Sequence, residues 1–146
     1  MKQLLTNDSA NAIIIMKENK KGIVMFNIEF YENNKGESEL WDFLESLRSQ
    51  SASNKDLRIQ YKQITFYIEL LKNSGTRLPE NITKHLDDGI WELRPGNNRV
   101  LYFFFQENTF VLLHHFRKKT QKTPKREIEK AKTERADYIS RKEASK

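Results

Sequence analysis

The sequence predicts an α+β fold in which a small antiparallel β-sheet packs against an N-terminal helical hairpin and a C-terminal basic helix. Three observations favour this fold class. Apolar residues between positions 40 and 71 recur at steps of three and four, which is helical spacing. Between positions 84 and 116, short apolar segments alternate with turn residues, a pattern typical of consecutive strands. Beyond position 117 the chain becomes basic and begins a last helix after a proline.

The first expected element is a strand within Gly22–Phe30. Alternate positions from Val24 to Phe30 are apolar, which is the period of a strand with one buried face. We therefore expect a working domain at 25–146. Residues 1–24 are then an N-terminal extension, either an upstream start or a loose arm, and the alternative is an ordered extra strand at Ala12–Met16. The apolar patch there lacks the length and cleavage site of a secretory signal.

Two helices follow, joined by a short polar loop. The first spans Leu40–Leu47, and the second has the clearest helical stripe in the chain, with apolar residues from Leu57 to Leu71 at steps of four, three, four and three. Asn73–Gly75 ends the second helix, because Asn, Ser and Gly favour helix termination. The short connection predicts a helical hairpin laid on the sheet.

Three strands and a helix complete the chain. The strands are expected to form an antiparallel meander and cover Ile90–Arg94, Arg99–Phe105 and Thr109–Phe116. Val100–Phe105 is apolar on both faces, which predicts a central strand. Thr123 as N-cap and Pro124 as first helical residue begin a helix that runs to about Arg141.

The net charge of +6 is concentrated at the C-terminus. Residues 117–146 hold twelve Lys or Arg and five Asp or Glu, a net charge of +7, so the preceding residues carry a net charge of −1. A concentrated basic segment attracts polyanions and points to nucleic acid before membrane. The alternative is an ordinary solvated helix face.

Composition and motifs exclude several classes of function. The absence of cysteine excludes disulfide scaffolds, thiol catalysis and Cys-ligated zinc. The longest apolar runs are far below the roughly 20 residues that cross a bilayer, so we expect a soluble protein without membrane contact. Asp87 and Asp88 precede a glycine and indicate a turn. His114 and His115 are neighbours on a strand, so they point to opposite faces and cannot share a metal site. We expect no metal and no cofactor.

A set of cationic and proton-transferring side chains belongs to the predicted sheet. Arg94 ends one strand and Arg99 opens the next, so antiparallel pairing places both at one edge. The set continues with Tyr102, His114, Arg117, Lys118 and Lys119. Metal-free RNA cleavage needs a group that removes the 2′-OH proton, cations on the phosphorane-like transition state, and an acid for the leaving 5′-oxygen. Structural alternatives remain: the arginines pair with Glu92 or Asp88, Tyr102 is core, and His114 is a satisfied half-buried histidine.

Three strings of residues resemble a known family. They are Leu86-Asp-Asp-Gly-Ile-Trp-Glu-Leu-Arg94, Arg99-Val-Leu-Tyr-Phe-Phe104, and Leu112-Leu-His-His-Phe-Arg-Lys-Lys-Thr-Gln-Lys-Thr-Pro124. Together they resemble the HigB branch (phage-derived, Gp49-like) of the RelE/ParE toxin superfamily. The resemblance covers about Met25 to Arg141 and implies a RelE-like fold. His115 departs from the pattern, because relatives commonly have a small residue there.

The resemblance implies a toxin of a type II toxin–antitoxin system. Such proteins are usually metal-independent endoribonucleases that cut mRNA on the ribosome and stop translation in the cytoplasm. The implied partners are the ribosome, mRNA and a helix-turn-helix (HigA-like) antitoxin, with operator DNA bound only through the antitoxin complex.

The resemblance also implies roles for individual residues. The implied catalytic residues are Arg94, Arg99, His114, Lys118 and Lys119, with Lys118 or His114 transferring protons and the arginines on the scissile phosphate. Tyr102, Lys122 and Lys125 are expected to bind RNA.

Two other functions fit the same sequence. One is a gyrase-poisoning toxin of the ParE kind, which needs no RNA-cleaving residues. The other is a non-enzymatic protein, either an inactive toxin relic or a nucleic-acid-binding partner of the antitoxin. The antitoxin contact surface is expected on the helical hairpin or on the basic C-terminal helix.

Overall fold

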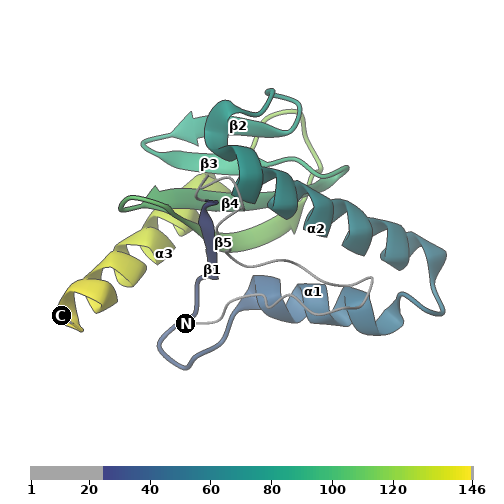
Figure 1. The fold of residues 1–146 in the computed structure, drawn as a ribbon, viewed down its shortest axis with the longest axis horizontal. Helices are drawn as coiled ribbons and strands as arrows, with labels where there is room; N and C mark the ends of the chain where they lie inside the picture. Colours follow the sequence, from purple (N-terminus) through teal and green to yellow (C-terminus); the bar gives the residue numbers. More distant parts are fainter. Residues whose placement is uncertain (1–24, 146) are drawn as a thin grey trace.

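Helices cover both faces of a five-stranded sheet (Figure 1). The computed structural model describes residues 25–145, so the predicted N-terminal extension and the alternative strand within it lie outside the described residues. The elements in chain order are β1 (Asn27–Phe30), α1 (Glu39–Gln50), α2 (Lys55–Ser74), the short 3₁₀ helix η1 (Gly75–Arg77), β2 (Thr83–Asp87), β3 (Ile90–Leu93), β4 (Asn98–Phe105), β5 (Thr109–Arg117) and α3 (Lys125–Ala144).

The strand order is β1-β5-β4-β3-β2, and the sheet is mixed rather than wholly antiparallel. The strands from β2 to β5 form an antiparallel meander, as predicted, but β1 pairs parallel to β5. The prediction of an antiparallel sheet was therefore wrong in this one pairing. Alternation of apolar residues identifies a strand but does not specify its neighbour, and β1 reaches β5 from the opposite end of the chain.

Strand β2 is an edge strand that the sequence analysis did not predict. Among its five residues only Thr83 is buried, and three are exposed. An edge strand with so little buried surface has no apolar alternation, so its sequence resembles a loop. The prediction of a meander with three strands thus becomes one with four.

Each face of the sheet has its own hydrophobic core. The hairpin of α1 and α2 covers one face, where Leu44, Ile64 and Ile68 pack against apolar residues of β1, β3, β4 and β5. Helix α3 covers the other face, where Ala131 and Tyr138 contact β3, β4 and β5. The result is a three-layer arrangement, visible in Figure 1 with α3 on one side of the sheet and α1 and α2 on the other.

Strand β4 lies at the centre of the sheet, as its apolar residues on both faces predicted. Val100 and Tyr102 belong to the core under the helical hairpin, whereas Leu101 and Phe103 belong to the core under α3. The central strand is buried from Asn98 to Phe103 and contributes apolar side chains to both cores.

Helix ends follow the predicted signals in α2 but not in α3. Gly75 follows α2 with a φ of 62°, a backbone conformation that favours glycine. Pro124, not Thr123, occupies the N-cap position of α3, and within the described part of the chain this helix has no capping hydrogen bond from its N-cap side chain. The Thr123 hydroxyl instead donates a hydrogen bond to Glu92 Oε1 at 2.6 Å. None of the described helices is long and apolar enough to span a bilayer.

Candidate functional site

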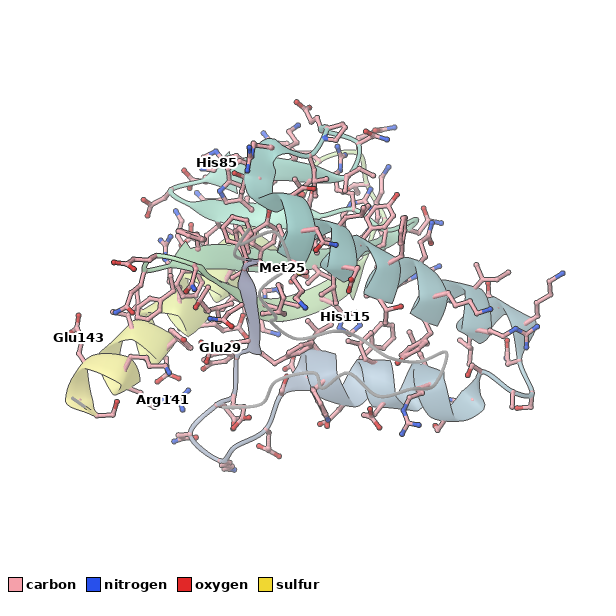
Figure 2. The ribbon with its side chains drawn as sticks, in the orientation of Figure 1. Met25, Glu29, His85, His115, Arg141 and Glu143 are labelled. Carbon is pink, nitrogen blue, oxygen red and sulfur yellow. The ribbon has the colours of Figure 1, made fainter. Side chains whose placement is uncertain are left out.

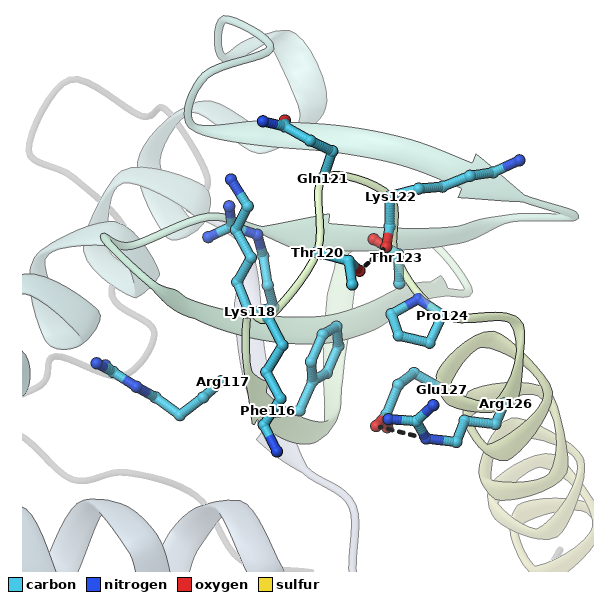
Figure 3. Close-up of a pocket in the computed structure, with 12 residues that line it drawn as sticks. Phe116, Arg117, Lys118, Thr120, Gln121, Lys122, Thr123, Pro124, Arg126 and Glu127 are labelled. Atoms are coloured by element: carbon cyan, nitrogen blue, oxygen red, sulfur yellow. Dashed lines mark hydrogen bonds and ion pairs between the residues drawn. The ribbon is translucent and has the colours of Figure 1, made fainter.

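A cationic pocket lies between the end of β5 and the first turn of α3 (Figure 3). Its volume is about 480 Å³. Six of the side chains that line it carry cationic groups, and Glu127 is the one carboxylate among its described lining residues. The lining residues are Arg99, Phe116, Arg117, Lys118, Lys119, Thr120, Gln121, Lys122, Thr123, Pro124, Arg126 and Glu127. This charge pattern suits an anionic ligand such as a phosphate chain.

Hydrogen bonds hold the loop that carries most of these cations. The backbone N–H of Lys118 donates to the carbonyl of Asn97 at 2.7 Å, which joins the start of the loop to the turn before β4. The Thr120 hydroxyl donates to the Lys122 carbonyl at 2.8 Å. The Thr123–Glu92 bond then fixes the end of the loop to β3. The loop is therefore bound to the sheet at both ends.

Arg94 and Arg99 meet at the same carboxylate. Glu92 is 2% exposed, and its Oε2 lies 3.4 Å from Arg94 Nε and 4.0 Å from Arg99 Nε. The two arginines therefore share one edge of the sheet, as predicted. The structural alternative of pairing with Glu92 also holds, so Glu92 stabilises two adjacent positive charges.

Arg99 contributes a largely buried guanidinium to the pocket. Its Nη1 donates to the carbonyls of Gly96 and Asn98 at 2.8 and 2.9 Å. Its Nη2 has no hydrogen-bond partner within the described part of the chain. Burial lowers the pKa of Arg99; nearby Glu92 opposes this shift and the positive charge of Arg94 adds to it. A phosphate would bring two new acceptors to this group.

The lysines differ in how closely they belong to the pocket. Lys118, Lys119 and Lys122 line it, and their ammonium groups make no hydrogen bond or ion pair with any described residue. Lys125 is exposed at the start of α3, beside the lining residue Arg126. Figure 3 shows Lys118 on the β5 side of the pocket and Glu127 on the α3 side. Three cationic groups are thus available to a bound anion.

His114 lies behind the pocket wall rather than in the pocket. It is 1% exposed, and its Nδ1 lies 2.6 Å from Glu134 Oε1 while its Nε2 lies 3.0 Å from Glu127 Oε1. Both ring nitrogens are therefore occupied by carboxylates of α3. Its role in catalysis stays a prediction. His114 does not line the pocket and contacts it only through Glu127, which does.

Tyr102 is a core residue in this structure. It is 0% exposed, and its hydroxyl lies 2.7 Å from the Thr83 hydroxyl. Burial raises the pKa of Tyr102 well above the usual range for tyrosine. RNA binding by Tyr102 stays a prediction, and this conformation offers RNA no access to the ring.

His115 points to the other face of the sheet, as strand geometry predicted. Its ring stacks on Phe43 of α1, with centroids 3.7 Å apart, and Figure 2 shows it between the sheet and α1. Burial lowers the pKa of His115 to about 4. Within residues 25–145, no three His, Cys, Asp or Glu side chains are arranged to hold a metal ion.

Two carboxylates of α3 that reach the sheet were not predicted from the sequence. Glu127 and Glu134 lie in helical register with Ala131 and Tyr138, at steps of four, three and four. Because Ala131 and Tyr138 are the buried residues of α3, this spacing was the signal that both carboxylates face inward.

Comparison with known proteins identifies the family. Residues 45–136 match the family described as phage derived protein Gp49-like (DUF891), and the chain belongs to this family, the HigB-type toxins of the RelE/ParE superfamily. Proteins of this family are typically RNase toxins, and family membership implies an antitoxin partner. No curated protein matches the chain.

Proposed function

We propose that the protein is a ribosome-dependent mRNA endoribonuclease, the toxin of a type II toxin–antitoxin pair that acts in the cytoplasm and is neutralised by a helix-turn-helix antitoxin. The observation that supports this proposal best is the cationic pocket, because six cationic side chains surround one cavity in a chain of an RNase toxin family.

The pocket has groups for most of the chemistry that RNA cleavage needs. Arg99 offers a guanidinium edge for the negative charge that develops on the scissile phosphate. The ammonium of Lys118 is a donor for the leaving 5′-oxygen. Lys119, Lys122 and Lys125 extend the basic surface along the loop and into α3, where flanking RNA would lie. Arg94 and Arg99 both approach the carboxylate of Glu92, so Arg94 adds a second positive charge close to Arg99.

The test is induction of the chain in cells, with and without the neighbouring gene, followed by mapping of new mRNA 5′ ends against the reading frame. We expect growth arrest and cuts inside translated frames, both relieved by the neighbouring gene. Lys118→Ala is expected to keep the fold, since its ammonium makes no hydrogen bond or ion pair with any described residue. It is expected to abolish the cuts, because the pocket loses the proton donor for the leaving oxygen. Lys35→Ala, which removes an exposed lysine from the turn before α1, is the matched control and should remain toxic.

Other outcomes would replace the proposal. Growth arrest with uncut mRNA and a DNA-damage response would indicate a gyrase poison. Absence of arrest, with salt-dependent binding of operator DNA by this chain alone, would indicate a non-enzymatic protein. Full toxicity of both Lys118→Ala and Arg94→Ala would contradict the proposed endoribonuclease.

A further inference from the structure

Glu127 occupies an unusual position in the cationic pocket. Among the described residues that line the pocket it is the only carboxylate, and its side chain is 16% exposed. Its Oε1 lies 3.0 Å from His114 Nε2. Its Oε2 forms an ion pair with Nε of Arg126 at 3.8 Å (Figure 3), which is too long for a hydrogen bond, and the Arg126 side chain is 76% exposed. One carboxylate oxygen is thus held from behind, and the other pairs only with an exposed arginine that a ligand could displace.

His114 and Glu134 fix the orientation of Glu127. The imidazole of His114 is buried and lies between the two carboxylates, so its ring cannot rotate without losing both contacts. A carboxylate, an imidazole and a second carboxylate in series form an arrangement that orients the first group, as in other acid–base sites. Lysine and arginine side chains are hydrogen-bond donors only, so Glu127 is the natural proton acceptor of this pocket.

We propose that Glu127 is the catalytic residue that removes the 2′-hydroxyl proton of bound RNA, and that His114 is a positioning residue that orients it. This inference rests on the proposed function. Glu127 Oε2 accepts the proton while the 2′-oxygen bonds to phosphorus and the bond from phosphorus to the 5′-oxygen breaks. The 5′-oxygen takes a proton from the Lys118 ammonium, and Arg99 stabilises the phosphorane-like charge. The products are a 2′,3′-cyclic phosphate and a 5′-hydroxyl end.

The test compares Glu127→Gln with wild type in cell-free translation, with cleavage of the translated mRNA followed by primer extension. Glutamine keeps the size and an oxygen acceptor for His114 but cannot take the proton. We expect cleavage to fall by about 100-fold or more, the usual contribution of general acid–base catalysis. Co-sedimentation with mRNA-loaded ribosomes should not weaken, because the change removes a negative charge from a basic pocket. The matched control is Glu129→Gln, which neutralises an exposed carboxylate on the same helix and should cleave like wild type.

Glu127→Asp and His114→Gln extend the test. The aspartate retracts the carboxylate by one methylene, so we expect it to recover part of the rate lost in Glu127→Gln. For His114→Gln we expect a lower single-turnover rate at saturating protein with an unchanged half-saturating concentration, since a positioning residue does not bind RNA.

Three results would overturn the inference. If Glu127 merely balances charge, Glu127→Gln will cleave as fast as wild type or faster and bind more tightly. An aspartate variant no faster than the glutamine variant would also contradict a carboxylate base. If wild type cuts no mRNA in the same reaction, the proposed function itself fails, and the role of Glu127 falls with it.

Discussion

Glu92 is the residue at which the polar contacts of the site converge. Its buried carboxylate approaches Arg94 and Arg99 and accepts a hydrogen bond from Thr123 at 2.6 Å. Removal of one partner from a buried ionic cluster leaves an uncompensated charge, which costs far more than an exposed pair contributes. At the scale of single residues, the site therefore depends on a carboxylate that lines no part of the cationic pocket.

We predict that Glu92→Ala destabilises the protein by about 3–5 kcal/mol, because Arg99 is 6% exposed and would lose its counter-charge. Urea unfolding at neutral pH measures the change. Glu80→Ala is the control, since its carboxylate is 74% exposed and pairs with Lys84 at 3.6 Å; it should cost less than about 1 kcal/mol. Equal losses in the two variants would contradict the role of Glu92.

His115 gives the stability a pH dependence. Burial lowers its pKa to about 4, from 6.5 in the unfolded chain, and its Nδ1 has no hydrogen-bond partner among residues 25–145. As pH falls below 6.5 the unfolded chain takes up a proton that the folded protein does not, so stability is lost down to about pH 4. We predict that the free energy of unfolding falls by about 2 kcal/mol between pH 7 and pH 5. This fall should be absent in His115→Phe, in which an aromatic ring still stacks on Phe43. Urea unfolding of both proteins at the two pH values checks it, and parallel losses would exclude His115 as the cause.

At the scale of elements, the junction between α2 and η1 depends on Gly75, which packs against Phe26 just before β1. A Cβ there would lie 3.0 Å from the ring of Phe26, at a φ that only glycine adopts easily. We predict that Gly75→Ala costs about 2–3 kcal/mol, because strain and crowding add. Gly36→Ala is the matched control, since Gly36 has a similar φ of 75° but a Cβ there would meet nothing closer than 3.9 Å. Thermal unfolding of the two variants isolates crowding by Phe26, and equal losses would show that backbone strain alone is responsible.

The sequence predicted the elements that bury apolar stripes and missed those that do not. Helices α1 and α2 and the central strand β4 were predictable because buried side chains impose their period on the sequence. Strand β2 was not, since an exposed edge strand needs no such period. The parallel pairing of β1 with β5 was also beyond the sequence, because strand neighbours depend on how the whole chain folds.

The candidate site was predictable in part for a similar reason. Lysines that lie close together in one loop are visible in the sequence, so Lys118, Lys119 and Lys122 could be predicted as a cationic group. The position of the Glu127 side chain could not be predicted in the same way, because it depends on which face of α3 packs against the sheet. That face became evident only when Ala131 and Tyr138 were seen in the core.

At the scale of the whole molecule, the three layers explain how a small protein presents a concentrated positive charge. The sheet and the two cores hold the loop after β5 against the start of α3, and five cations of this junction line the pocket: Arg117, Lys118, Lys119, Lys122 and Arg126. Tyr138 joins α3 to the edge strand β1, because its hydroxyl donates a hydrogen bond to Glu29 at 2.9 Å.

The most direct test of the account is to add the purified protein to a reconstituted translation reaction and identify the ends of any mRNA fragments. We expect cuts within the translated frame that leave 5′-hydroxyl and 2′,3′-cyclic phosphate ends, and we expect these cuts to be lost in Lys118→Ala. Intact mRNA in the presence of folded wild-type protein would contradict it.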